Sequence, residues 1–165
     1  MSDMIEASLV VERTYKASVE ELWDLWTTKE GFASWWGPQE FRADVHMLEG
    51  RLGGALHYDM VADTPAAIKA MQDMGEAVSH ETRGTFTEFE PCKRLVLTHI
   101  IDFLPGVEPY ENRIVVQFFP AADGQVRMVV TLTGMHSPEF TQMQIEGFTS
   151  QLTKLDKRYG WKADG

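Results

Sequence analysis

His99 has the most informative position among the residues able to do chemistry. It takes its place in the alternating apolar register of the stretch Leu95–Phe103, so the buried face of a predicted strand also carries an imidazole. There it can act as an acid or base in a cyclase- or hydratase-like enzyme. The alternative is a buried histidine that hydrogen-bonds to the backbone or to Tyr110. His99 is the one candidate we name for catalysis, and no complete catalytic set accompanies it.

The other four histidines do not form a metal motif. They are His46, His57, His80 and His136, and none belongs to an HxH or HExxH pattern. His57 and Asp59 share one face of a strand, but that face opposes Tyr58 and is predicted to meet solvent. A serine elbow, a Gly-rich phosphate loop and an EF-hand are also missing from the sequence. We therefore predict neither a metal nor a cofactor.

Cys92 is the single cysteine, so an internal disulfide is impossible and a reducing compartment is favoured. It lies in a Pro91–Arg94 turn, where the neighbouring cations can lower its pKa. Because nothing nearby resembles the base that activates a nucleophile, we predict a structural or neutral role.

The composition favours one globular domain over residues 1–165, with its core at about 9–159, since 44% of the residues are hydrophobic. A net charge of -10 disfavours nucleic acid and anionic membrane surfaces as partners. Without an 18-residue apolar run or a signal peptide in the sequence, we expect a cytoplasmic protein.

The stretch Ser137–Tyr159 is predicted to form one long amphipathic helix, capped by Ser137 and with Pro138 in its first turn. Its apolar stripe consists of Phe140, Met143, Gly147, Phe148, Leu152, Leu155 and Tyr159. Gln144 and Gln151 lie beside the stripe. Gly147 removes a side chain in mid-helix, which indicates either close approach of a strand or a hollow for a ligand.

The rest of the chain predicts mostly strands. Alternating or β-branched patterns mark Leu9–Tyr15, Phe41–Met47, Leu56–Met60, His80–Glu90, Arg94–Phe103, Asn112–Phe119 and Val126–Thr133. A capping box at Ser18–Glu21 and a cap at Thr28 begin two helices after the first strand. A short helix at Pro65–Met74, capped by Gly75, is inserted after the third strand. We expect an α+β fold in which a curved seven-stranded antiparallel sheet surrounds the C-terminal helix.

Several segments in this order resemble a known family. They include Ser18–Trp23, the Trp35-Trp36-Gly37-Pro38 segment, the Gly50–Gly54 turn, Arg94–Thr98 and Gly147–Leu152. Together they resemble proteins similar to the activator of the ninety-kilodalton heat-shock protein ATPase, within the START-like (SRPBCC) helix-grip superfamily. The resemblance implies a hydrophobic cavity between the sheet and the C-terminal helix, which in the superfamily holds lipids, sterols, polyketides or hormones.

The first hypothesis for function is therefore the binding of a small apolar molecule. The predicted ligand-binding residues are Trp36, Met47, Tyr58, Met60, Phe86, His99, Ile101, Tyr110, Phe140, Met143, Gly147 and Phe148. One alternative is a cavity enzyme that uses His99, and another is an interaction protein that stimulates a chaperone ATPase. A homodimer is possible, and no residue pattern indicates it.

Overall fold

The structure is a computed structural model, and it describes residues 8–37, 39–101, 106, 108–133 and 138–161. The predicted helix cap Ser137 and the strand end at Phe103 lie outside the described residues.

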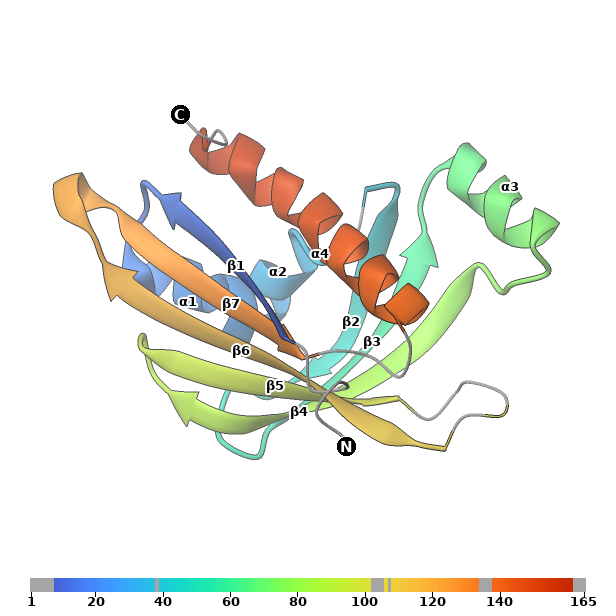
Figure 1. The fold of residues 1–165 in the computed structure, drawn as a ribbon, viewed down its shortest axis with the longest axis horizontal. Helices are drawn as coiled ribbons and strands as arrows, with labels where there is room; N and C mark the ends of the chain where they lie inside the picture. Colours follow the sequence, from blue (N-terminus) through green and yellow to red (C-terminus); the bar gives the residue numbers. More distant parts are fainter. Residues whose placement is uncertain (1–7, 38, 102–105, 107, 134–137, 162–165) are drawn as a thin grey trace.

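One seven-stranded sheet organises the molecule (Figure 1). Its strands are β1 (Ser8–Tyr15), β2 (Phe41–Leu48), β3 (Ala55–Ala62), β4 (Ser79–Glu90), β5 (Arg94–Ile101), β6 (Tyr110–Pro120) and β7 (Val126–Thr133). The order across the sheet is β1-β7-β6-β5-β4-β3-β2, and every neighbouring pair is antiparallel. Short turns join the consecutive strands from β2 to β7, apart from the inserted helix between β3 and β4 and the longer β5–β6 connection, while β1 crosses to the far edge beside β7.

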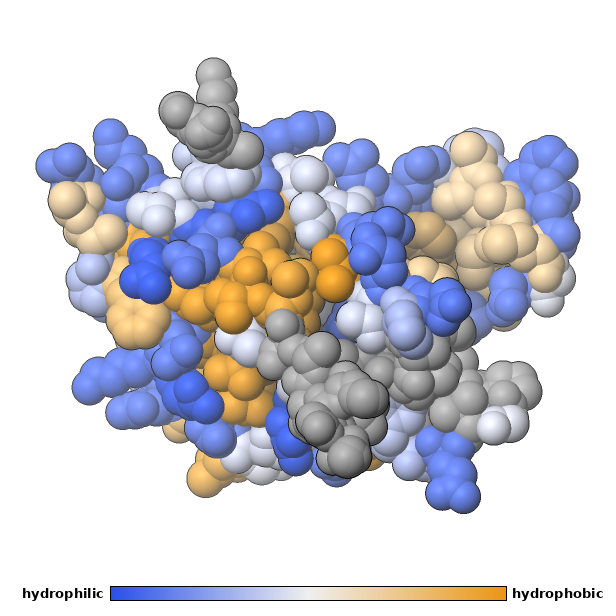
Figure 2. Space-filling view, viewed as in Figure 1, coloured by the Kyte–Doolittle hydropathy of each residue, from blue (hydrophilic) through white to orange (hydrophobic). Residues whose placement is uncertain are grey.

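The helices are α1 (Val19–Thr27), α2 (Lys29–Ala33), α3 (Pro65–Asp73) and α4 (Pro138–Tyr159), with a 3-10 turn, η2, at Ala122–Gly124. Figure 1 shows α4 running diagonally across the curved sheet, and α3 projecting at one end of it. Apolar residues gather between α4 and the sheet, over β1, whereas the rim of this view is largely hydrophilic (Figure 2). The predicted α+β architecture is thus confirmed: the sheet bends around the C-terminal helix.

Side-chain caps fix where the short helices begin. Oγ of Ser18 accepts a hydrogen bond from the amide of Glu21 at 3.0 Å, as the capping box predicts. The Glu21 carboxylate, however, accepts from the hydroxyl of Tyr159 at 2.8 Å. The serine half of the capping box is therefore confirmed, whereas the Glu21 side chain links α1 to the end of α4.

The middle of the concave side is filled by aromatic rings. Trp26 and Trp35 are fully buried with ring centroids 5.0 Å apart, and Trp36 is 5.1 Å from Trp35. The indole N–H of Trp35 donates to the carbonyl of Leu25 at 2.8 Å, so its polar atom is satisfied without water. The tryptophan segment is therefore a packing element of the core.

None of the helices described here is long and apolar enough to cross a membrane.

Cys92 lies in the β4–β5 turn, where burial and the carboxylates of Glu20 and Asp24 raise the pKa of its thiol. The predicted lowering by neighbouring cations is wrong, because acidic residues of α1 face the thiol.

Candidate ligand-binding site

Three predicted site residues meet on the concave side: Trp36, Tyr58 and His99. The Trp36 indole N–H donates to the Tyr58 hydroxyl at 2.9 Å, and Nε2 of His99 lies 3.4 Å from the same oxygen. The imidazole also stacks on Trp36, with ring centroids 6.5 Å apart and planes 15° from parallel. All three residues are buried. His99 thus meets Tyr58, and not Tyr110, as its hydrogen-bonding neighbour.

Burial sets the protonation states of this cluster. It lowers the pKa of His99 to about 4, so the imidazole is neutral at pH 7. It also raises the pKa of Tyr58 to about 12, although hydrogen bonds to Trp36 and Thr82 act in the opposite direction. Tyr58 is therefore a neutral hydroxyl that accepts from the indole and has one proton to donate.

A second buried polar group connects the sheet to α4. Asn112, which pairs with His99 across the β5–β6 ladder, donates from Nδ2 to the carbonyl of Thr133 at 3.0 Å. Its Oδ1 accepts from Nε2 of Gln144 at 2.9 Å. Polar contacts therefore extend from the centre of the concave face to the N-terminal half of α4.

Gln151 lies one turn after Gly147, on the side of α4 that packs toward the core. Its Oε1 accepts the backbone N–H of Gly37 at 3.0 Å, while its Nε2 is buried and has no hydrogen-bond partner. Gly37 has φ of 109°, a conformation that favours glycine, and a Cβ at this position would lie 3.3 Å from the sulfur of Met60. Gln151, Gly37 and Met60 are therefore neighbours.

The C-terminal half of α4 is fixed to the sheet by charged hydrogen bonds. Oδ1 of Asp156 accepts from Nε of Arg13 at 3.1 Å and from the Tyr15 hydroxyl at 2.6 Å. Burial, together with the hydrogen bond to Asp156, raises the pKa of Tyr15. Arg13, which interrupts the apolar face of β1 in the sequence, thus has its partner on the helix.

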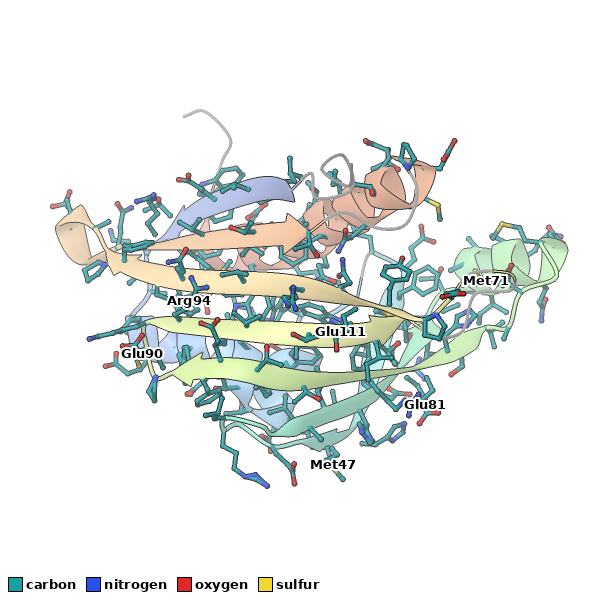
Figure 3. All side chains as sticks on the ribbon, turned by 60° about the horizontal axis from the view of Figure 1, so that its bottom comes forward. Met47, Met71, Glu81, Glu90, Arg94 and Glu111 are labelled. Atoms are coloured by element: carbon teal, nitrogen blue, oxygen red, sulfur yellow. The ribbon has the colours of Figure 1, made fainter. Side chains whose placement is uncertain are left out.

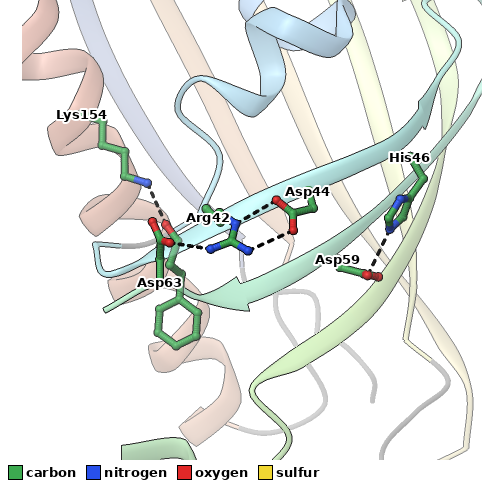
Figure 4. A network of polar contacts seen from close by, with 7 residues as sticks. Arg42, Asp44, His46, Asp59, Asp63 and Lys154 are labelled. Atoms are coloured by element: carbon green, nitrogen blue, oxygen red, sulfur yellow. Dashed lines mark hydrogen bonds and ion pairs between the residues drawn. The ribbon is translucent and has the colours of Figure 1, made fainter. Parts of the chain in front are cut away.

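A further set of polar contacts joins α4 to the edge strand β2 (Figure 4). Nζ of Lys154 donates to the carbonyl of Phe41 at 3.2 Å. Beside it, Arg42 pairs with Asp44 and Asp63. Here too the contact comes from the C-terminal half of the helix.

The N-terminal half of α4 is different. Among the described side chains of Pro138–Gly147 none is buried, and Met143 is 61% exposed. From Phe148 onward the helix buries Phe148, Gln151, Leu152 and Leu155. The transition falls at Gly147, which is half-buried.

Of the remaining predicted residues, two join the Trp36 cluster. Phe148 packs against Trp36 with ring centroids 6.3 Å apart, and Met60 lies beside Gly37, so both join the Trp36 cluster. Tyr110 is half-buried at the start of β6. The side chains of Ile101 and Phe140 lie outside the described residues.

Three predicted site residues lie elsewhere. Met47 is 42% exposed and pairs with His57, because the register shifts between Val45 and Met47 and turns its side chain to the convex face (Figure 3). Met143 is exposed on α4. Phe86 is fully buried in the hydrophobic core, and its ring centroid lies 5.5 Å from that of Phe89.

The sequence interpretation did not include four polar residues of this region among the site residues. They are Thr82, Asn112, Gln144 and Gln151. The spacing of seven between Gln144 and Gln151, two helical turns along the apolar stripe, was the available signal. On the convex face His46 pairs with Asp59 at 3.1 Å, and no group of three potential metal ligands occurs in the described part of the chain.

The described geometry defines a class of protein: a helix-grip α+β domain, in which a long C-terminal helix lies in the curve of an antiparallel sheet. The model of the family "Activator of Hsp90 ATPase homolog 1-like protein" matches residues 16–160. The chain therefore belongs to this family. A comparison with curated protein sequences found no match.

Solved structures show the same fold. In its crystal structure, a protein from Chromobacterium violaceum superposes on this one with a TM-score of 0.71. The two sequences are 17% identical, and the match covers 93% of this chain and 97% of the other. The AHSA1 protein of Silicibacter pomeroyi has 21% identity and a TM-score of 0.71, with 92% and 96% covered. A solution structure from Arthrobacter aurescens has 22% identity and a TM-score of 0.71, with 99% and 91% covered. At these identities the likeness concerns the fold alone.

Proposed function

We propose that this protein binds a small, largely apolar molecule between the N-terminal half of α4 and the part of the concave face that carries Tyr58 and His99. The observation that carries the proposal is the contrast along α4: none of the described side chains before Phe148 is buried, although polar and aromatic groups gather on the sheet beside the helix. A ligand placed there would remove apolar surface from water and meet a few fixed polar atoms, as small-molecule sites commonly do.

The state of His99 favours binding over catalysis. With a pKa of about 4, the imidazole is a weak base at pH 7 and carries no proton that it would readily give away as an acid. Its contacts with Tyr58 and Trp36 hold the ring in place. We therefore assign His99 to the polar lining of the site.

A neutral fluorescent probe, N-phenyl-1-naphthylamine, tests the proposal. Its emission should rise on titration of the wild-type protein, and Gly147→Leu should weaken the binding at least about tenfold, because it adds a bulky side chain one turn before Gln151. Gln142→Leu is the matched control, since Gln142 is exposed on the same helix and should leave the affinity unchanged.

Thermal unfolding of both variants shows whether the fold is intact, and leucine at position 147 suits a helix better than glycine does. A wild-type protein that leaves the probe dark, or a Gly147→Leu variant that binds it as tightly as wild type, would contradict the proposal.

A further inference from the structure

The amide group of Gln151 has an unused hydrogen-bond donor in the interior of the protein. The residue is 3% exposed, its Oε1 is taken by the N–H of Gly37, and its Nε2 has no partner. A buried donor without an acceptor costs about 1–3 kcal/mol, so most such groups in folded proteins are paired. The hydrogen bond from Gly37 also fixes which end of the amide carries the unpaired hydrogens.

Gly147 lies one helical turn before Gln151 in α4. Side chains on a helix lean toward its N-terminus and lie over the residue four positions earlier. For Gln151 that residue is Gly147, which has no side chain. The amide therefore lies at the boundary between the packed half of α4 and the half that buries no described side chain.

The neighbours of the amide belong to the proposed ligand site. Gly37 follows Trp36, whose indole donates to Tyr58, and Met60 lies against Gly37. Gly37 thus connects the amide to Trp36, its neighbour in the sequence, and through the Trp36 indole to Tyr58. An acceptor brought by a ligand would complete the hydrogen bonding of Gln151 in a region that is otherwise apolar.

Resting on the proposed function, we propose that the ligand carries an uncharged acceptor oxygen, such as the carbonyl of a ketone or ester, that pairs with Nε2 of Gln151. A neutral amide donor matches a neutral carbonyl in strength, whereas a carboxylate would have to enter a protein of net charge -10. The ligand class is therefore an apolar skeleton bearing a carbonyl group.

A pair of probes of nearly the same shape tests this assignment: 2-acetylnaphthalene, which has a carbonyl oxygen, and 2-ethylnaphthalene, which has none. Wild-type protein should bind the ketone about 3- to 10-fold more tightly than the hydrocarbon, as one neutral hydrogen bond allows. In Gln151→Met this preference should fall to about onefold, while affinity for the hydrocarbon is kept. Gln142→Met is the control, because the exposed Gln142 should leave the ratio as in wild type.

A measurement on the wild-type protein does not depend on how a variant folds. In ¹⁵N–¹H spectra the side-chain amide signal of Gln151 should shift when the ketone binds, and should shift much less with the hydrocarbon. Equal affinities for the two probes, or an unmoved Gln151 amide signal in the ketone complex, would overturn the assignment and leave the proposed function standing. Failure of both probes to bind would overturn the proposed function, and the assignment with it.

Discussion

The two halves of α4 differ in what they contribute to the molecule. The half after Gly147 buries Phe148, Leu152 and Leu155 in the core, and its Asp156 binds Arg13 and Tyr15 of β1. The half before it buries no described side chain, and its Gln144 reaches Asn112 through an amide hydrogen bond. One continuous helix thus combines a segment that packs into the core with a segment whose described side chains are exposed or half-buried.

The part of α4 that stabilises the fold is therefore separate from the part where we propose that a ligand binds. Apolar burial supplies most of the free energy of folding, and the core cluster here combines strand residues with the tryptophans and, on α4, with the residues from Phe148 onward. We therefore expect the other half of the helix to contribute little to the free energy of unfolding. Substitutions in the tryptophan core, at His99 and in each half of α4 should therefore differ in their effect on the free energy of unfolding.

Trp35→Ala should lower the free energy of unfolding by about 3–5 kcal/mol, because the ring is fully buried among other aromatic residues. Met143→Ala, in the exposed half of α4, should change it by less than about 0.5 kcal/mol. Urea denaturation of both variants provides the comparison. Similar losses in the two would show that the exposed half of α4 contributes as much to stability as the buried tryptophan cluster.

The buried His99 should make stability depend on pH. Because burial lowers its pKa from 6.5 to about 4, the unfolded chain binds a proton in this interval and the folded chain does not. Stability should therefore fall as the pH falls from 6.5 toward 4, by ~3 kcal/mol in total from this residue. His99→Gln should remove this part of the pH dependence, and parallel unfolding curves for the two proteins from pH 7 to 4 would refute it.

Asp156→Ala should cost about 2 kcal/mol, since it leaves the mostly buried Arg13 and Tyr15 without their shared acceptor. The control is Glu146→Ala, in the N-terminal half, where the exposed carboxylate bonds only to Gln142 among the contacts described. We expect a change of less than about 0.5 kcal/mol for this control. Denaturant midpoints that move equally for both variants would count against the anchoring role of Asp156.

Gln144→Ala should have the smallest effect, about 1 kcal/mol, because the loss leaves Oδ1 of the buried Asn112 without the hydrogen bond from α4. The change should also speed amide exchange in the first turns of α4 while leaving the turns after Leu152 unaffected. Hydrogen exchange measured by mass spectrometry distinguishes the two segments, and slower exchange in the variant would contradict the prediction.

Much of the fold could be predicted from the sequence, because alternation and capping are local signals. The strands Arg94–Phe103 and Val126–Thr133 were expected close to where β5 and β7 lie, and the cap at Thr28 holds the amide of Gly31 at 3.0 Å. The sequence also shows that Arg13 interrupts the apolar face of β1. It does not show that the partner of Arg13 is Asp156 on α4, 143 positions away.

The site was harder to predict because it depends on register and on distant contacts. The predicted face of the sheet was wrong for Met47, because a single bulge turns its side chain outward. No local residue pattern indicates that bulge. The apolar register of their strands indicated Tyr58 and His99, and the Trp-Trp-Gly-Pro segment contained Trp36. Their hydrogen bonds, however, depend on how three separate elements meet. The unpaired amide of Gln151 became visible only once Gly37 was placed beside it.

Hydrogen exchange along α4, measured with and without N-phenyl-1-naphthylamine, tests the division of the helix at Gly147 most directly. We predict fast exchange before Gly147 and slow exchange after Leu152 in the free protein, with the probe slowing exchange in the first segment only. Uniform exchange along the whole helix, unchanged by a bound probe, would contradict the division of α4 on which the proposed function depends.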